Sequence, residues 1–130
     1  MKNNKKIIIA DQDITIISIL QLILKENGFD PISTTSGTTC LELINKTQPP
    51  KLLLLDTNIT DISLDRIITT TREIHATLPI LLLNKNPTHK LINSSHIRYC
   101  HGIIYKPFDA EELLNFIKQI LNSTRKWEHK

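Results

Sequence analysis

Acidic and basic side chains follow several short apolar runs of this 130-residue chain. Asp11 and Asp56 each come directly after such a run, and Lys106 follows another one, next to a proline. Two carboxylates that lie within several ångströms of each other repel and raise one pKa unless a cation joins them. Mg²⁺ suits this place, because it takes hard oxygen ligands and is commonly held by one or two carboxylates together with phosphate. Asp56 is then a candidate nucleophile toward phosphorus, with the metal and the Lys106 ammonium neutralising the phosphoryl oxygens. A surface lysine is the other interpretation of Lys106.

The stretches around these residues predict alternating strands and helices. Several apolar runs are continuous, which is typical of strands buried on both faces of a parallel sheet. Asp13 and Asp109 are placed to cap helices, and Gly28 to end one in a left-handed conformation. The expected strands are 6–10, 32–35, 52–56, 80–84 and 103–105. The expected helices are 14–27, 38–46, 64–76, a weaker one within 88–98, and 110–122.

The element order predicts where the polar residues meet. Strands that alternate with helices through short connections form right-handed crossovers, and this favours a doubly wound α/β sheet. Ligands of such sheets bind at the carboxyl ends of the strands. Asp11, Asp56, Asn84 and Lys106 all stand at those ends. We therefore expect them to converge at one edge of the sheet.

Composition excludes several classes of protein. At 40% hydrophobic and 22% charged residues the chain is an ordinary globular one, and its length suits a single domain at a prior of ~150 residues per domain. Its three glycines are scattered, which excludes Walker loops and dinucleotide fingerprints. The net charge of +3 lies largely at the two ends, without interleaved aromatic residues. This charge pattern leads us to expect no direct nucleic-acid partner. Because apolar runs do not exceed four residues, we also expect no membrane partner and a cytoplasmic protein.

Four segments occur in a fixed order along the chain. They are IIIADQD at 7–13, LLLLDTN at 52–58, PILLL at 79–83 and KPFD at 106–109. Together they resemble the receiver domain of bacterial two-component response regulators. The likeness spans about residues 5–121, and it implies a flavodoxin-like (β/α)5 fold with strand order 2-1-3-4-5. We expect a receiver domain over 1–121 and a tail or the start of a linker over 122–130.

The resemblance implies a phosphorylation switch. Asp56 would accept a phosphoryl group from a histidine kinase or phosphotransfer protein, and the domain would catalyse only its own phosphorylation and dephosphorylation. Asp11, Asp56 and the backbone carbonyl of Asn58 would hold Mg²⁺. Lys106 matches the family's lysine, whose bond to the following Pro107 is expected to be cis. Output would pass to an attached domain or a separate effector through the fourth helix, fifth strand and fifth helix.

Several residues depart from the family pattern. Gln12 replaces an acidic metal ligand, so Mg²⁺ should bind more weakly. Asn84 replaces a Thr or Ser whose hydroxyl bonds the phosphoryl group. Lys85 replaces a small residue and has two possible places, paired with Asp56 in the stead of a metal or extended into water. Ile103 replaces an aromatic residue that changes rotamer on activation, a motion that a branched aliphatic side chain cannot make.

Two other functions remain open at this point. The first is a pseudo-receiver that binds its partner independently of phosphorylation, which the substitutions favour and the retained Asp11, Asp56 and Lys106 oppose. The second rests on residues 56–60, which are similar to the DxDxT motif of haloacid-dehalogenase-type phosphatases. Asn58 stands there in place of the general acid/base, so such an enzyme would lack its proton shuttle.

Overall fold

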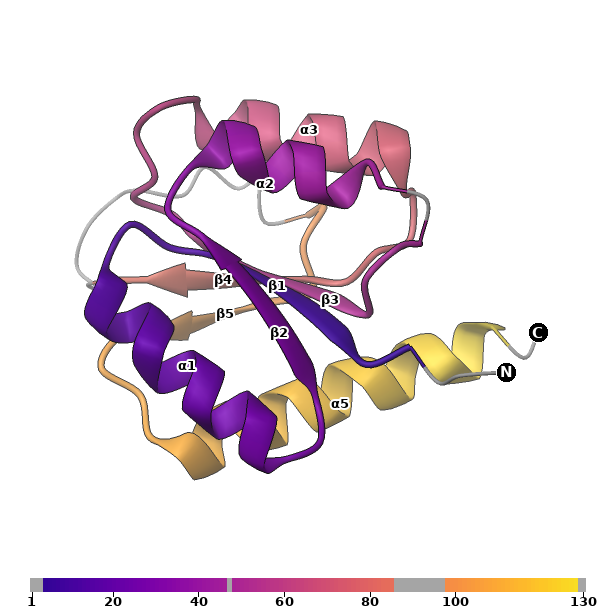
Figure 1. The fold of residues 1–130 in the computed structure, drawn as a ribbon. Coiled ribbons are helices and arrows are strands. Elements are labelled where there is room, and N and C mark those ends of the chain that lie inside the picture. The colour runs from indigo at the N-terminus through magenta and orange to yellow at the C-terminus, as the bar shows by residue number, and fades with distance from the viewer. Residues whose placement is uncertain (1–3, 47, 86–97, 129–130) are drawn as a thin grey trace.

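The computed structural model describes residues 4–46, 48–85 and 98–128, and side chains up to Ser123. All five expected strands and four of the five expected helices form; the helix expected within 88–98 lies mostly outside the described residues. The elements, labelled as in Figure 1, are β1 (Lys6–Ala10), α1 (Ile14–Glu26), β2 (Asp30–Thr34), α2 (Gly37–Ile44), β3 (Leu52–Asp56), α3 (Leu64–Ile74), β4 (Ile80–Asn84), β5 (Gly102–Tyr105) and α5 (Ala110–Glu128).

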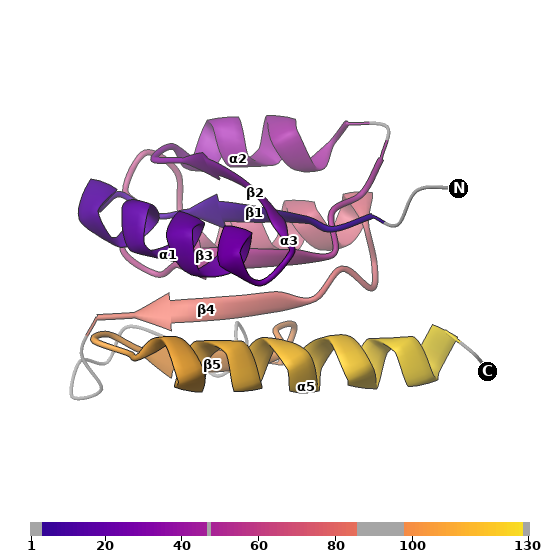
Figure 2. The same ribbon diagram turned by 60° about the horizontal axis from the view of Figure 1, so that its bottom comes forward.

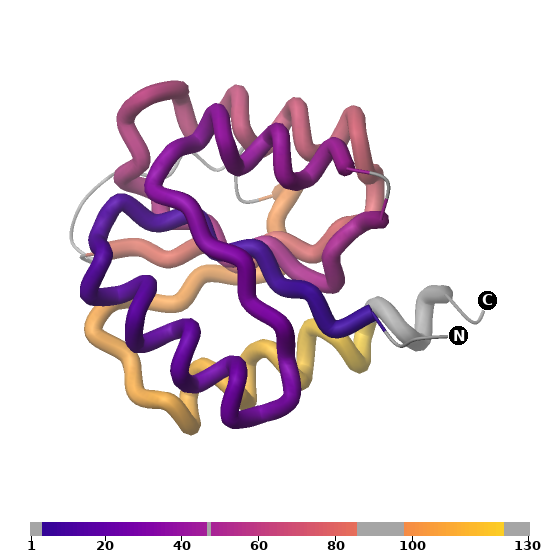
Figure 3. Tube along the Cα trace, viewed as in Figure 1, coloured from indigo at the N-terminus to yellow at the C-terminus, as the bar shows by residue number. Residues whose placement is uncertain are grey.

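The strands form one parallel sheet in the order β2-β1-β3-β4-β5, which confirms the expected topology. Helices α1 and α5 cover one face and α2 and α3 the other (Figures 1 and 2). The path of the chain is easiest to follow in the tube of Figure 3, where every strand runs toward the same edge. In the part of the chain that the structure describes, no helix is both long and apolar enough to span a membrane.

Side-chain alternation along the strands divides the core into two clusters. Leu52 and Leu54 face α1 and α5, whereas Leu53 and Leu55 face α2 and α3. All four leucines have 0% exposure. This double burial is the reason that the run is continuously apolar rather than alternating.

The element ends follow the predicted caps. The Asp13 carboxylate accepts from the Thr15 N–H at 2.9 Å, the Asp109 carboxylate accepts from the Glu112 N–H at 2.7 Å, and Gly28 has φ 87°. Several boundaries differ from expectation, and two of the differences have a physical reason. Strand β2 begins at Asp30 and includes a proline, which an edge strand tolerates because it need not donate on both sides. Helix α5 continues past 122 to Glu128, since no glycine or proline interrupts it.

Arg72 ties the end of α3 to the segment before β5. Its guanidinium donates to the backbone carbonyl of Leu78 at 2.7 Å and to that of His75 at 3.3 Å. The Nε–H donates to the Tyr99 carbonyl at 3.1 Å, and a second N–H donates to the same oxygen. One side chain therefore satisfies three carbonyls that lie outside the sheet ladder.

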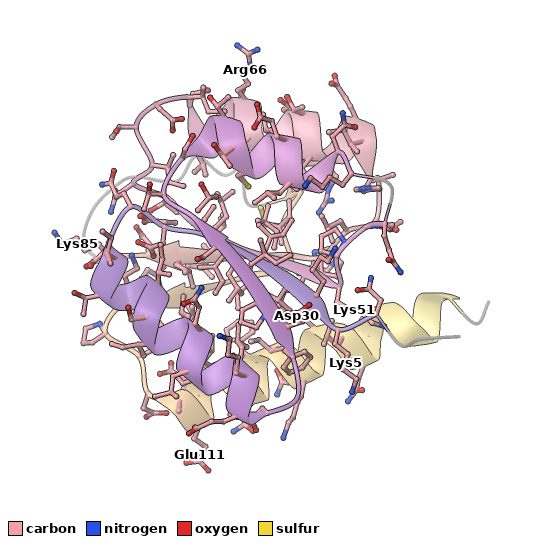
Figure 4. The ribbon with its side chains drawn as sticks, viewed as in Figure 1. Lys5, Asp30, Lys51, Arg66, Lys85 and Glu111 are labelled. Atoms are coloured by element: carbon pink, nitrogen blue, oxygen red, sulfur yellow. The ribbon has the colours of Figure 1, made fainter. Side chains whose placement is uncertain are left out.

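Arg72→Met should lower the free energy of unfolding by about 1–2 kcal/mol, because the carbonyls lose a charged donor while the aliphatic length is kept. Urea unfolding followed by circular dichroism measures this change. Arg66→Met on the same helix is the control, since Arg66 is exposed and points into solvent (Figure 4). An equal loss in both variants would contradict the role assigned to Arg72.

Candidate functional site

The strand register brings the expected residues to one edge of the sheet. Ala10 pairs with Leu55, so the residues that follow them, Asp11 and Asp56, are neighbours. Strand β5 arrives from the other side, where the N–H of Lys106 donates to the carbonyl of Asn84 at 2.8 Å. The Lys106–Pro107 peptide bond is cis, as the family resemblance implied.

Asp11, Asp56 and Lys106 meet in one ion-paired cluster. The Lys106 Nζ lies 2.8 Å from Asp11 Oδ2 and 3.5 Å from Asp56 Oδ1. Asp11 and Asp56 are buried, and the lysine side chain is only 12% exposed. One ammonium therefore forms ion pairs with two carboxylates that are almost fully shielded from solvent.

Burial raises the pKa of Asp11 above its ordinary value of 3.8, and the negative charge of Asp56 adds to this rise. The Lys106 ammonium and the Asp13 N–H, which donates to Asp11 Oδ1 at 2.8 Å, act in the opposite direction. Among the described residues, the buried Asp11 Oδ2 has no polar partner apart from Lys106. This oxygen thus keeps a lone pair available for a further cation or donor.

Backbone amides hold both oxygens of Asp56. The Asn58 N–H donates to Oδ1 at 3.0 Å, and the Gln12 N–H donates to Oδ2 at 3.3 Å. The contact of Gln12 with Asp56 therefore comes from its backbone, while its side chain is exposed. The carboxylate is fixed in orientation by groups that do not depend on side-chain identity.

Asn84 lies beside this cluster with 3% exposure and a partner that the sequence did not indicate. The Thr57 hydroxyl donates to Asn84 Oδ1 at 2.9 Å. The backbone supports the pair, because the Thr57 N–H donates to the Leu83 carbonyl at 3.0 Å. Its position directly after Asp56 is the one sequence feature that could have pointed to Thr57.

Lys85 and Ile103 are the other two substituted positions. Lys85 is exposed and points away from the molecule (Figure 4), so the alternative in which it pairs with Asp56 is wrong. Lys106 holds that place. Ile103 is half-buried and packs against the core cluster under α2 and α3, while the nearby Tyr105 is 41% exposed.

Asp61 is a further residue of this region that the sequence did not single out. Its carboxylate accepts from the Ser36 hydroxyl and the Gly37 N–H, both at 2.8 Å, and from the Thr38 N–H at 3.1 Å. These bonds hold the pKa of Asp61 well below its usual range. The approach is close, since a Cβ atom on Gly37 would lie 2.8 Å from Ile62 Cγ1. Asp61 thereby ties the loop after β3 to the start of α2.

The donor set fits a hard divalent cation with few protein ligands. Among the described residues, no group of three or more His, Cys, Asp or Glu side chains is arranged to hold a metal. Asp11 and Asp56 nevertheless supply two carboxylates, and Asp11 Oδ2 has a lone pair to offer. Mg²⁺ is commonly bound by one or two carboxylates and keeps several waters.

Comparison with known proteins agrees with this geometry. The family described as the response regulator receiver domain matches residues 7–118. The alkaline phosphatase synthesis transcriptional regulatory protein PhoP of Bacillus subtilis (strain 168) is 30% identical over 119 residues, which cover 91% of this chain and 49% of that protein. This chain thus spans about half the length of that curated relative.

Solved structures share the fold at lower identity. A response regulator receiver domain protein (CheY-like) from Methanospirillum hungatei JF-1 has a TM-score of 0.86 at 21% identity, covering 95% of this chain and 98% of that one. A receiver domain protein from Clostridium thermocellum has a TM-score of 0.84 at 17% identity, covering 94% and 98%. NtrX from Brucella abortus has a TM-score of 0.87 at 20% identity, covering 98% and 29%.

The fold and the family match define a receiver domain of two-component signalling. The chain belongs to the response regulator receiver domain family. The family match favours this assignment over the phosphatase interpretation of residues 56–60. In agreement, Asp56 ends the third strand, whereas the phosphatases carry their motif on the first.

Asp11→Asn should make the protein more stable than the wild type at pH 7. The raised pKa means that the folded chain keeps a proton which the unfolded chain releases near 3.8. The free energy of unfolding of the wild type therefore falls as the pH rises from 3.8 toward the raised pKa of Asp11. Asparagine cannot titrate, so the variant does not lose this stability. The difference in the free energy of unfolding between Asp11→Asn and the wild type should therefore be largest at pH 7 and shrink toward pH 4.

Urea unfolding at the two pH values measures this difference. Asp13→Asn is the matched control, because asparagine caps a helix about as well as aspartate. A variant Asp11→Asn that is less stable than the wild type at pH 7 would show that the ion pair with Lys106 outweighs burial.

Proposed function

We propose that this receiver domain accepts a phosphoryl group on Asp56 from the phosphohistidine of a histidine kinase or phosphotransfer protein. The observation that carries the proposal is the position of the Lys106 ammonium, 2.8 Å from Asp11 and 3.5 Å from Asp56. A positive charge next to an oriented, nearly buried carboxylate stabilises the charge that develops on a transferring phosphoryl group.

The proposed reaction is a direct displacement at phosphorus. One Asp56 oxygen forms a bond to phosphorus while the phosphorus–nitrogen bond of the phosphohistidine breaks, and its electron pair stays on the imidazole nitrogen. The Asn58 and Gln12 N–H groups hold the carboxylate in place during the attack. Lys106 then faces the new phosphoryl oxygens. Hydrolysis reverses the modification when water attacks phosphorus and the carboxylate leaves.

Asp11, Asp56 and the backbone carbonyl of Asn58 would hold Mg²⁺ at this site. When bound, the metal neutralises phosphoryl oxygens as a Lewis acid. The exposed Gln12 side chain offers an amide where an additional carboxylate would offer a full charge. We therefore infer weaker metal binding than a receiver with two acidic residues at positions 11 and 12 would have.

The output of the domain is proposed to be a protein contact. Phosphorylation adds about −1.5 to −2 charges at the edge of the sheet and biases neighbouring loops and helices. The proposed partner face comprises β5, α5 and the segment between β4 and β5, of which residues 86–97 lie outside the described part. An output domain beyond residue 130 or a separate effector would receive the signal, in the cytoplasm.

Incubation with acetyl phosphate and Mg²⁺, followed by intact-mass measurement, tests the proposal. The wild type should gain the mass of one phosphoryl group, and Asp56→Asn should gain none, because an amide is a poor nucleophile. Asp65→Asn, at an exposed position in the first turn of α3, is the control that should react like the wild type. Absence of the adduct on the wild type would contradict the proposal.

A pseudo-receiver is the alternative that specific observations favour. Ile103 is a half-buried aliphatic residue packed into the core, so it provides no aromatic switch. The Lys106 ammonium already pairs with both carboxylates, which places a cation where a metal would otherwise be required. If the chain is a pseudo-receiver, the wild type and the Asp56→Asn variant should bind the partner with equal affinity. Addition of Mg²⁺ should then cause no change in the spectrum of the protein.

Gln12→Asp should tighten Mg²⁺ binding on the order of tenfold, because a full negative charge then lies beside the dication. Isothermal titration calorimetry measures the dissociation constants. Gln12→Asn keeps an amide at this position and serves as the control, with little expected change. Equal affinity of the Gln12→Asp variant and the wild type would place the side chain of residue 12 away from the metal.

A further inference from the structure

A side-chain pair next to the phosphoacceptor has no place in the function described so far. The Thr57 hydroxyl donates to Asn84 Oδ1 at 2.9 Å, from the residue after Asp56 to the last residue of β4. Asn84 is 3% exposed and Thr57 is half-buried. A hydrogen bond in such a place contributes more than one in open solvent, since the buried Asn84 amide cannot turn to water instead.

The backbone places this pair between the two halves of the site. The Thr57 N–H donates to the carbonyl of Leu83 at 3.0 Å, and the Lys106 N–H donates to the carbonyl of Asn84 at 2.8 Å. Asn84 therefore adjoins both the segment that carries Asp56 and the residue that carries the ammonium.

The chemistry of an amide makes its orientation matter here. An amide has an acceptor end and a donor end, whereas the hydroxyl of a Thr or Ser can donate in any rotamer. A phosphoryl group is an anion, so the NH₂ end would bind it and the oxygen end would repel it. The bond from Thr57 occupies the oxygen end.

We propose that Thr57 is a positioning residue for Asn84. Its hydroxyl holds the amide oxygen and leaves the NH₂ group as the donor to the phosphoryl group on Asp56. This inference rests on the proposed phosphorylation of Asp56. One amide then binds Thr57 and the phosphoryl group at the same time, so Asn84 need not leave its resting partner when the phosphoryl group arrives.

The experiment measures the initial rate of Asp56 phosphorylation by acetyl phosphate at fixed Mg²⁺, with intact-mass detection. Thr57→Val keeps the shape of the side chain but has no donor, and it should slow the reaction about five- to tenfold. Thr57→Ser restores the hydroxyl and should react within about twofold of the wild type. Thr60→Val is the matched control, because this exposed threonine lies in the same loop.

A double-mutant cycle separates positioning from a purely structural role. In the Asn84→Ala background there is no amide to orient, so Thr57→Val should have no further effect on the rate. Thr57→Ala, which also lacks the hydroxyl, should repeat the result of Thr57→Val, and urea unfolding of each variant verifies that it is folded. An equal loss of rate with and without Asn84 would overturn the inference, as would an unchanged rate in Thr57→Val.

The outcome for the wild type distinguishes the two levels of the proposal. A wild type that forms no adduct overturns the proposed function and this inference with it. A wild type that forms the adduct at the same rate as Thr57→Val overturns the positioning role alone and leaves Asp56 as the phosphoacceptor.

Discussion

The site depends on one ammonium placed between two buried carboxylates. Burial of a carboxylate disfavours its charged form, and a second carboxylate nearby adds to the penalty. Lys106 opposes both effects from a single position, at 2.8 Å and 3.5 Å from the two carboxylates. That position exists only if β1, β3 and β5 end at the same edge, because each strand contributes one member. The parallel order β2-β1-β3-β4-β5 is therefore the condition for this ion-paired cluster as well as for the core.

The fold could be predicted because strong local signals agreed with the topology. The run at 52–55 is apolar on both sides of the strand, and Asp13 and Gly28 mark the two ends of α1. Strand β2 begins two residues before its expected start, because a proline is unfavourable in most strands but acceptable in an edge strand. The bond between Thr57 and Asn84 could not be predicted, because it depends on side-chain rotamers at two strand ends and not on any periodic pattern.

Retained and substituted positions differ in where they lie. Asp11 and Asp56 are buried and the Lys106 side chain is nearly so, and these three retained charges form the interior of the site. Gln12 and Lys85 are exposed, so their side chains lie outside the buried cluster of charges. Asn84 is a substituted residue that is itself buried, and its amide oxygen accepts from the Thr57 hydroxyl.

The bond network of Asp61 has a consequence for how this chain can vary. A Cβ atom on residue 37 would lie 2.8 Å from Ile62 Cγ1 and 2.9 Å from Ile67 Cδ1, so both side chains would have to shift. It would also lie 3.2 Å from the Asp61 carboxylate, which accepts from the Gly37 N–H at 2.8 Å. A residue at 61 without an acceptor oxygen would in turn leave this N–H without its partner. A substitution at either position therefore affects the contacts of the other, although the two residues stand 24 positions apart.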